Sequence, residues 1–335
     1  MKKINVLDCT LRDGGYVNNW KFGEEDAVNI VKKLSESNLD IIEVGFIRNE
    51  TYNRDRTVFT CKDDFKNILS NKKHNVKYAA LIEMANYFPI EKLWNRGDDT
   101  VDAIRYSFWK RKLDEGWEYA KQIKEKGYDL FVQPTRVEQY SDVEFENMIK
   151  KFNELQPTAL YIVDTFGLLT HKQVIHYAQI ADRVLGKDIA LGYHAHNNKQ
   201  QALLNAVSFL ELELDREVCV DSSVFGMGRG PGNLCTEIIT EYINNNFSGN
   251  YILPKYYDVF DNHISKIYNE KKWGYSLEYF LSAGYGANPS LAEYYHDAGL
   301  SMYELDRLFS NIPYEDRIRF SKETSEELYN KYKDK

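Results

Sequence analysis

The chain has little of several features that would define its class. It has only four cysteines in 335 residues and no C-x-x-C pairing, so we expect free thiols in a reducing compartment rather than a disulfide scaffold. No apolar run approaches the roughly 20 residues that span a bilayer. Asp8 interrupts the apolar stretch at the amino terminus too early for a signal peptide. These absences predict a cytoplasmic protein that does not act at a membrane.

Positive charge is also scarce. The chain carries 43 Lys and Arg against 51 Asp and Glu, a net charge of −8, so most of its surface would repel nucleic-acid phosphates. This balance excludes nucleic acid as the main partner but leaves a small acidic substrate open, because such a substrate responds to local charge. The 43% hydrophobic content is ordinary for a globular protein, and the length suffices for one large core.

A glycine-rich dinucleotide loop is missing as well. The turn at 13–16 lacks the G-x-G-x-x-G spacing, which argues against an open doubly wound sheet. Eight short apolar runs alternate instead with mostly amphipathic segments, such as 28–34, that show helical spacing. This alternation predicts an α/β fold, a closed (β/α)8 TIM barrel. We expect its strands at 4–8, 41–45, 78–82, 103–107, 130–134, 160–164, 190–194 and 218–221.

The last quarter of the sequence differs in composition from the rest. We expect a barrel-closing helix at 234–245, after the glycine-rich stretch 226–232. Beyond this helix the chain is rich in Tyr, Phe, Trp and charge. The segments 277–281 and 302–305 have helical patterns. We therefore predict a barrel domain at 1–248 and a helical carboxyl-terminal extension at 249–335, which either closes the active site, forms a dimer interface or docks a second enzyme.

Three side chains at predicted strand ends point to a metal site. His194 and His196 are two residues apart, so on a strand they point to the same face. Asp13 lies just beyond the first strand. In a closed barrel only the eighth strand lies between the first strand and the seventh, so the three side chains can converge. Two histidines and a carboxylate can hold a divalent metal and leave positions open for substrate. Arg12, beside the carboxylate, suits a developing oxyanion.

Each of these residues also has a purely structural interpretation. An isolated His-x-His pair is more often held by backbone and water, and Arg12 with Asp13 alone could be a salt bridge at the barrel end. Asn233 either adds an amide oxygen to the metal or caps a helix that begins at residue 234. Glu43, at the second strand end, needs a buried partner, and Arg12 is the obvious one. Asp164 either orients a ligand or caps a helix.

Four motifs resemble the signatures of the DRE-TIM metallolyases, a superfamily related to HMG-CoA lyase. They lie at 8–14 (DCTLRDG), 42–45 (IEVG), 194–198 (HAHNN) and 228–237 (GRGPGNLCTE), and they span the whole predicted barrel. The resemblance implies that Asp13, His194 and His196 are metal ligands, with Asn233 as a fourth. It also implies that Arg12 stabilises an enolate and that Glu43 supports the site.

Departures from these motifs distinguish between the members of the superfamily. The loop 226–230 lacks the catalytic cysteine of HMG-CoA lyases, and Gly15-Tyr16 replaces the Glu-Gln that is usual in the condensing synthases. The chain most resembles the 4-hydroxy-2-oxovalerate aldolases, but Tyr16 stands where those aldolases place a histidine thought to be the base. With an unperturbed pKa of about 10, Tyr16 is a poor base unless its surroundings lower that value. Tyr275 resembles an active-site tyrosine of the aldolases, although packing between extension and barrel explains it as well.

The sequence thus predicts a metal-dependent carbon–carbon lyase. Mn²⁺ or Mg²⁺ would be the cofactor, a pyruvate-like 2-oxo acid and an aldehyde the substrates, and Tyr16 the base, directly or through water. Two alternatives remain, a Claisen-type lyase or synthase acting on acyl-CoA and a non-catalytic barrel that serves as a scaffold. A homodimer and an aldehyde dehydrogenase partner are further expectations from the resemblance.

Overall fold

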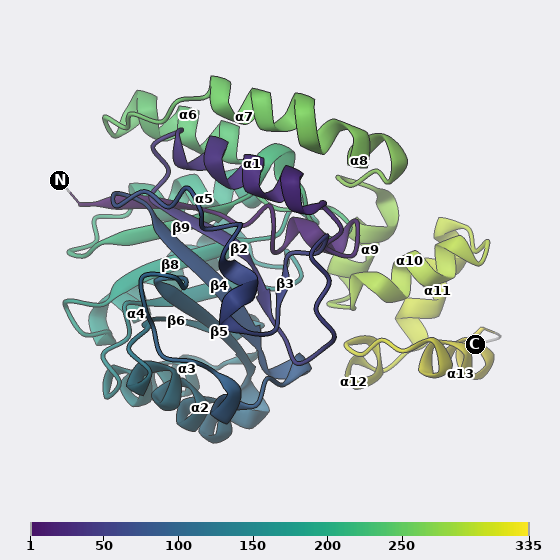
Figure 1. The fold of residues 1–335 in the computed structure, drawn as a ribbon. Coiled ribbons are helices and arrows are strands. Elements are labelled where there is room, and N and C mark those ends of the chain that lie inside the picture. The colour runs from purple at the N-terminus through teal and green to yellow at the C-terminus, as the bar shows by residue number, and fades with distance from the viewer. Residues whose placement is uncertain (1, 334–335) are drawn as a thin grey trace.

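The computed structural model describes residues 2–333 and confirms the predicted TIM barrel (Figure 1). Eight parallel strands follow one another around the barrel, which closes where β1 pairs with β2 through Leu7 and Ile41. All eight predicted strands are present, most of them longer by one or two residues. They are β1 (Ile4–Asp8), β2 (Ile41–Ile47), β4 (Lys77–Glu83), β5 (Ala103–Trp109), β6 (Asp129–Thr135), β7 (Ala159–Asp164), β8 (Ala190–Ala195) and β9 (Val218–Ser222).

Amphipathic helices cover the outside of the barrel. They bury their apolar faces against the strands, and their charged faces remain outward. They are α1 (Glu24–Ser35), α2 (Leu113–Glu125), α3 (Asp142–Asn153), α4 (His171–Val184), α5 (Ala202–Glu211) and α6 (Thr236–Asn246). Two strands are not followed by an α-helix. β2 leads to the short strand β3 (Val58–Phe59) and a 3-10 turn, and β4 leads only to 3-10 turns such as Met84–Asn86.

The barrel lumen has an apolar lower layer and a polar upper layer. Side chains of Ile41, Ala103 and Cys219 lie in one buried cluster, together with eight other lumen residues. Because side chains alternate along a strand, the residues two positions further on also face the lumen, nearer the carboxyl ends. Those next positions hold Glu43, Arg105 and Asp221, all buried. The polar layer therefore forms where active sites of this fold lie.

The carboxyl-terminal helices divide into two groups. The first group, α7 (Pro254–Val259), a π-helical turn (Phe260–Ile264) and α8 (Ser265–Glu270), buries residues in the same core as the barrel, and α7 lies along α1 (Figure 1). The second group has a core of its own. It consists of α9 (Leu277–Gly284), α10 (Pro289–Asp297), α11 (Met302–Asn311), α12 (Tyr314–Arg317) and α13 (Lys322–Tyr332). The covering of the barrel thus continues beyond residue 248, and the boundary at 248/249 stays a prediction.

The second group lies over the carboxyl end of the barrel. Arg136, after β6, donates a hydrogen bond of 2.7 Å from Nη2 to the hydroxyl of Tyr314. Arg229, after β9, donates one of 3.5 Å to Asn288 Oδ1. These contacts place the start of α10 beside the mouth of the barrel. Within residues 2–333, no helix has the length and apolar character required to cross a membrane.

Asp8 makes the stability of this barrel depend on pH. Its carboxylate is buried at the end of β1, where it accepts hydrogen bonds from Thr10 N and Thr236 Oγ1. Burial outweighs these bonds and raises the pKa of Asp8 from 3.8 to about 6. The folded state therefore binds the proton more tightly than the unfolded state does, and this contribution to stability is lost as pH rises through 6.

We expect Asp8 to lower the free energy of unfolding by about 2 to 3 kcal/mol between pH 4 and 7, because one pKa unit corresponds to about 1.4 kcal/mol. Urea unfolding at several pH values, compared between the wild type and Asp8→Asn, measures this contribution. Burial also raises the pKa of Asp164, to about 7. Asp164 is present in both proteins, so its effect on stability cancels in the difference. A difference that does not change with pH would contradict the prediction.

Candidate metal centre and active site

The turn after β1 brings Asp13 back over the barrel lumen. The backbone N–H of Asp13 donates to Cys9 O over 2.8 Å, and a 3-10 turn at Gly14–Tyr16 follows. Gly15 is needed there, since a Cβ at this position would lie 2.0 Å from Cδ1 of Trp20. This close packing fixes the turn, and the Asp13 carboxylate is buried beneath it.

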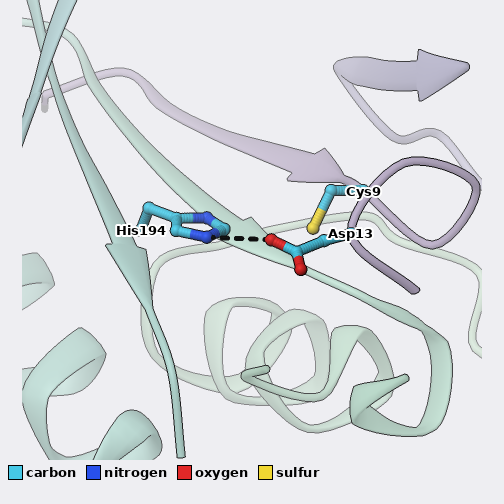
Figure 2. Close-up of side chains that lie close together, drawn as sticks. All are labelled: Cys9, Asp13 and His194. Carbon is cyan, nitrogen blue, oxygen red and sulfur yellow. Dashed lines mark ion pairs between the residues drawn. The ribbon is translucent and has the colours of Figure 1, made fainter. Parts of the chain in front are cut away.

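Both predicted histidines converge on one oxygen of that carboxylate. His194 Nε2 lies 3.1 Å and His196 Nε2 lies 3.8 Å from Asp13 Oδ2. Figure 2 shows His194 reaching from β8 toward Asp13, with Cys9 beside them. The structure thus brings together the three side chains that the sequence predicted to converge.

The other ring nitrogen of each histidine is fixed from behind. Nδ1 of His194 lies 2.8 Å from Asp221 Oδ2, and Nδ1 of His196 lies 2.9 Å from the backbone oxygen of Asp164. Both partners are acceptors. The backbone oxygen of Asp164 can only accept, and the Asp221 carboxylate is ionised because Arg105 and His194 outweigh burial and lower the pKa of Asp221. We therefore assign one proton of each ring to Nδ1, so that Nε2 can donate to the Asp13 carboxylate when the ring is charged and can bind a cation when the ring is neutral. A cation between them would satisfy all three groups.

Asn233 offers a fourth oxygen. The residue is buried beside His196, with which it forms a backbone bridge, and its Nδ2 donates to Met227 O over 3.0 Å. Its Oδ1 is buried without a hydrogen-bond partner among the described residues. Asn233 does not cap α6, because that helix begins at Thr236 and Cys235 occupies the cap position. An unpartnered buried oxygen on a residue whose backbone pairs with that of His196 fits a ligand of a divalent cation.

Cys9 is a neighbour of this cluster that the sequence analysis did not select. Ligand atoms of Cys9, Asp13 and His194 all lie within 4.8 Å of one another. The thiol, however, lies 3.2 Å from Ser222 O as a donor, and burial raises its pKa well above the usual value. A protonated thiol is a poor metal ligand, so we leave Cys9 out of the proposed set.

A chain of buried charges holds Arg12 in place. Arg12 donates from Nε to Glu43 Oε2 and from Nη1 to Asp13 Oδ2, both over 2.7 Å. The ion pair that the sequence predicted between Arg12 and Glu43 is confirmed. Arg105, which the sequence analysis missed, donates to the same Glu43 oxygen over 2.7 Å and also pairs with Asp221. The sequence did indicate a buried ion pair here, because Arg105 is an arginine in the middle of an apolar strand.

The same charges set the state of the Asp13 carboxylate. Burial alone would raise its pKa, but Arg12, His194 and His196 hold the pKa of Asp13 well below its usual range. Asp13 is therefore ionised at neutral pH and provides the negative charge that a divalent cation requires. Asp164 has a different role, since its carboxylate accepts from Leu168 N and Leu169 N and so holds the loop after β7.

A cavity of about 180 Å³ opens in front of the cluster. Arg12, Asp13 and both histidines line it, and Arg229 and Pro289 close its outer side. The remaining wall combines polar side chains with apolar ones. The polar residues are Ser107, Gln133, Thr135, Thr165 and Asn198, and the apolar ones are Phe46, Leu81, Val163, Phe166 and Pro231. The cavity thus presents the cluster to a small polar molecule.

The two predicted tyrosines have different positions. Tyr16 lines the cavity, and its hydroxyl lies 3.5 Å from Glu83 Oε2. Burial and the nearby carboxylates raise the pKa of Tyr16, so it does not ionise at neutral pH and cannot start the reaction as a free phenolate base. Tyr275 is 49% exposed, contacts the ring of Phe280, and is not among the residues that line the cavity.

Comparisons with known proteins agree with this architecture. The chain is 24% identical over 243 residues to 4-hydroxy-2-oxovalerate aldolase of Geobacillus genomosp. 3, which covers 72% of this chain and 70% of that protein. It is 24% identical over 236 residues to oxaloacetate decarboxylase of Mycobacterium tuberculosis, with 70% and 68% covered.

Solved structures show the same fold. The N-terminal domain of a putative aldolase from Bacteroides vulgatus matches with a TM-score of 0.76 and 23% identity, covering 87% of this chain and 96% of that domain. HMG-CoA lyase of Bacillus subtilis matches with a TM-score of 0.62 and 19% identity, covering 81% and 94%. The family model described as HMGL-like matches residues 3–247, which confirms the resemblance to the DRE-TIM metallolyases. The chain belongs to the HMGL-like family.

Proposed function

We propose that this chain is a divalent-metal-dependent aldolase that makes or breaks a carbon–carbon bond between the enolate of a pyruvate-like 2-oxo acid and an aldehyde. The observation that carries the proposal is the convergence of both Nε2 atoms on Asp13 Oδ2, with Nδ1 of each ring already held. Aldolase and decarboxylase activities of the relatives at 24% identity support it, because both reactions cleave a bond next to a 2-oxo acid.

Asp13, His194, His196 and Asn233 are the proposed ligands. Oxygen donors together with two imidazoles suit Mn²⁺ or Mg²⁺. When bound, such a cation would supply a Lewis acid that polarises the keto oxygen of the 2-oxo acid and stabilises the enolate.

Arg12 is the proposed electrostatic partner of the enolate. Its guanidinium is buried at the cavity wall, and the bonds to Glu43 and Asp13 fix its orientation before substrate enters. A preorganised donor costs no rearrangement when negative charge develops. Glu43 acts through Arg12 and is a positioning residue.

The hydroxyl and amide side chains in the cavity wall can bind the oxygens of a hydroxylated aldehyde, which we propose as the acceptor. A cytoplasmic location, a homodimer and an aldehyde dehydrogenase partner stay predictions from the sequence. The start of α10 at the cavity mouth supports the role of the extension in closing the active site.

Exchange of pyruvate methyl protons with deuterated water, followed by NMR, tests the proposal. We expect exchange with Mn²⁺, none with chelator, and a loss of at least about 100-fold in His194→Ala. His176→Ala is the matched control, because that histidine pairs with Asp142 on the surface. Exchange that persists in chelator, or in His194→Ala, would reject metal-dependent enolate chemistry.

A decarboxylase would form the same enolate from a 2-oxo diacid, and the name of the second relative favours testing this reaction. Release of CO₂ from oxaloacetate and cleavage of hydroxylated aldol substrates should be measured in parallel. Faster decarboxylation than aldol cleavage would identify CO₂, rather than an aldehyde, as the second product.

A further inference from the structure

Glu83 is a carboxylate at the active-site cavity that has no role in the proposed function. It is the last residue of β4, two positions beyond Leu81, and both residues line the cavity. Among the cavity-lining residues, Asp13 is the other carboxylate, and it belongs to the metal cluster. Glu83 is therefore the lining carboxylate that lies outside the metal cluster.

The two oxygens of Glu83 have different surroundings. Oε1 accepts from Arg48 Nη2 over 2.5 Å and from Asn86 Nδ2 over 2.6 Å. The buried Arg48 guanidinium lies 4.2 Å from the ring centre of Trp20 and 4.0 Å from that of Phe46, which fixes its position. Oε2 faces the Tyr16 hydroxyl at 3.5 Å. One oxygen thus anchors the carboxylate, and the other is directed toward Tyr16.

Aromatic packing holds Tyr16 beside this carboxylate. Its ring packs edge-on against Trp20, with 4.8 Å between ring centres, and against Phe46, with 6.0 Å. Its hydroxyl is directed at Glu83 Oε2 and can donate its proton there. A hydroxyl that keeps its own proton can still pass one on, provided that it donates to one acceptor while it accepts from another group.

We infer that Tyr16 and Glu83 form a proton relay for the proposed aldol reaction, with Tyr16 as the catalytic residue and Glu83 as the group that stores the proton. The inference rests on the proposed function. In the cleavage direction, the substrate hydroxyl gives its proton to Tyr16 Oη as Tyr16 gives its own to Glu83 Oε2. The aldehyde C=O forms, the carbon–carbon bond breaks, and its electron pair moves into the enolate.

The same relay completes the cycle. After the aldehyde leaves, Glu83 returns the stored proton to Tyr16, and Tyr16 passes its proton to the terminal carbon of the enolate, which becomes the methyl group of pyruvate. Atoms and charges balance, because the hydroxyl proton of the substrate becomes a methyl proton of the product. Exchange of pyruvate methyl protons therefore requires the relay as well.

Glu83→Gln tests the relay with little change in shape. Its amide oxygen can still accept from Arg48 and Asn86, whereas its nitrogen cannot take a proton from Tyr16. We expect pyruvate methyl exchange and aldol cleavage to fall by about 100-fold or more, the usual effect of losing general acid–base catalysis. KM for the 2-oxo acid should change by less than about threefold, and binding of Mn²⁺ and pyruvate, followed by water proton relaxation, should be unchanged.

Tyr16→Phe should show the same loss, and the double variant should lose no more than either single variant, because the two residues act as one unit. Glu91→Gln is the matched control, since Glu91 is exposed on the same connection and lies outside the cavity. Should Glu83→Gln not fold, Glu83→Asp, which keeps the charge beside Arg48, takes its place with an expected partial loss.

The outcomes separate the relay from the proposed function. Normal exchange in Glu83→Gln or Tyr16→Phe, or losses that multiply in the double variant, would overturn the relay and leave the metal-dependent enolate chemistry in place. Loss of pyruvate binding in Glu83→Gln would also overturn it, because Glu83 would then be a binding residue. A wild type with no metal-dependent exchange would refute the proposed function itself.

Discussion

Replacing Asp13 with asparagine should weaken Mn²⁺ binding by more than about 100-fold and abolish metal-dependent turnover. Removing a group that only orients a metal ligand typically costs about 10–100-fold in affinity, so losing a ligand itself should cost more. Asp13 is also the only charged member of the proposed set, and its Oδ2 faces both histidines. Asparagine keeps the size of the side chain, so the loss reports the missing charge.

Titration of free Mn²⁺ by electron paramagnetic resonance measures this affinity directly. Asp221→Asn should give an intermediate loss of about 10–100-fold, because Asp221 only orients His194 through Nδ1. Asp142→Asn, at an exposed ion pair with His176, should bind Mn²⁺ like the wild type. Equal affinity in Asp13→Asn and the wild type would remove Asp13 from the metal site.

Replacing Arg105 with methionine should lower the free energy of unfolding by about 3–5 kcal/mol, the usual cost of removing one partner of a buried ion pair. Arg105 is fully buried and neutralises both Glu43 and Asp221. Methionine fills part of the space but leaves the two carboxylates with less compensation in the lumen. Urea unfolding at pH 7 measures the loss.

The matched control is Arg96→Met. Arg96 is exposed and reaches Asp102 at 3.5 Å, and a surface pair of this kind contributes at most about 1 kcal/mol. Adding Glu43→Gln to Arg105→Met removes one stranded charge and should restore part of the stability. A loss in Arg105→Met no greater than that in Arg96→Met would show that the lumen tolerates the two carboxylates without their counterion.

The sequence predicted the barrel because its strands are local features. Each strand is a short run of Val, Ile, Leu, Ala and Tyr between charged helical segments, and a fully buried parallel strand requires such a run. The strand boundaries were not predicted as well, since the strands continue into polar residues such as Glu83 and Ser222. These residues are buried or partly buried because of their position in the sheet. The absence of α-helices after β2 and β4 was not predicted.

The proposed metal ligands were predictable for a similar reason. His194 and His196 share a strand face by spacing alone, and Asp13 follows a strand that a closed barrel places nearby. The residues that support them were not predictable. Asp221 and Arg105 come from two other strands, and nothing in their local sequence indicates that one pairs with the other or with His194. Glu83 was missed too, because its meaning depends on Arg48 and Tyr16.

The strands, the barrel that they form and the residue types at its carboxyl end follow from local sequence, because hydrophobic spacing and strand periodicity are encoded over a few neighbouring residues. Which side chains meet depends on the folded barrel. There, Arg12 and Arg105 share Glu43, the Asn233 oxygen has no hydrogen-bond partner among residues 2–333, and Tyr275 stays outside the cavity. These contacts join residues far apart in the chain, and their energies depend on burial and distance, which the closed barrel creates.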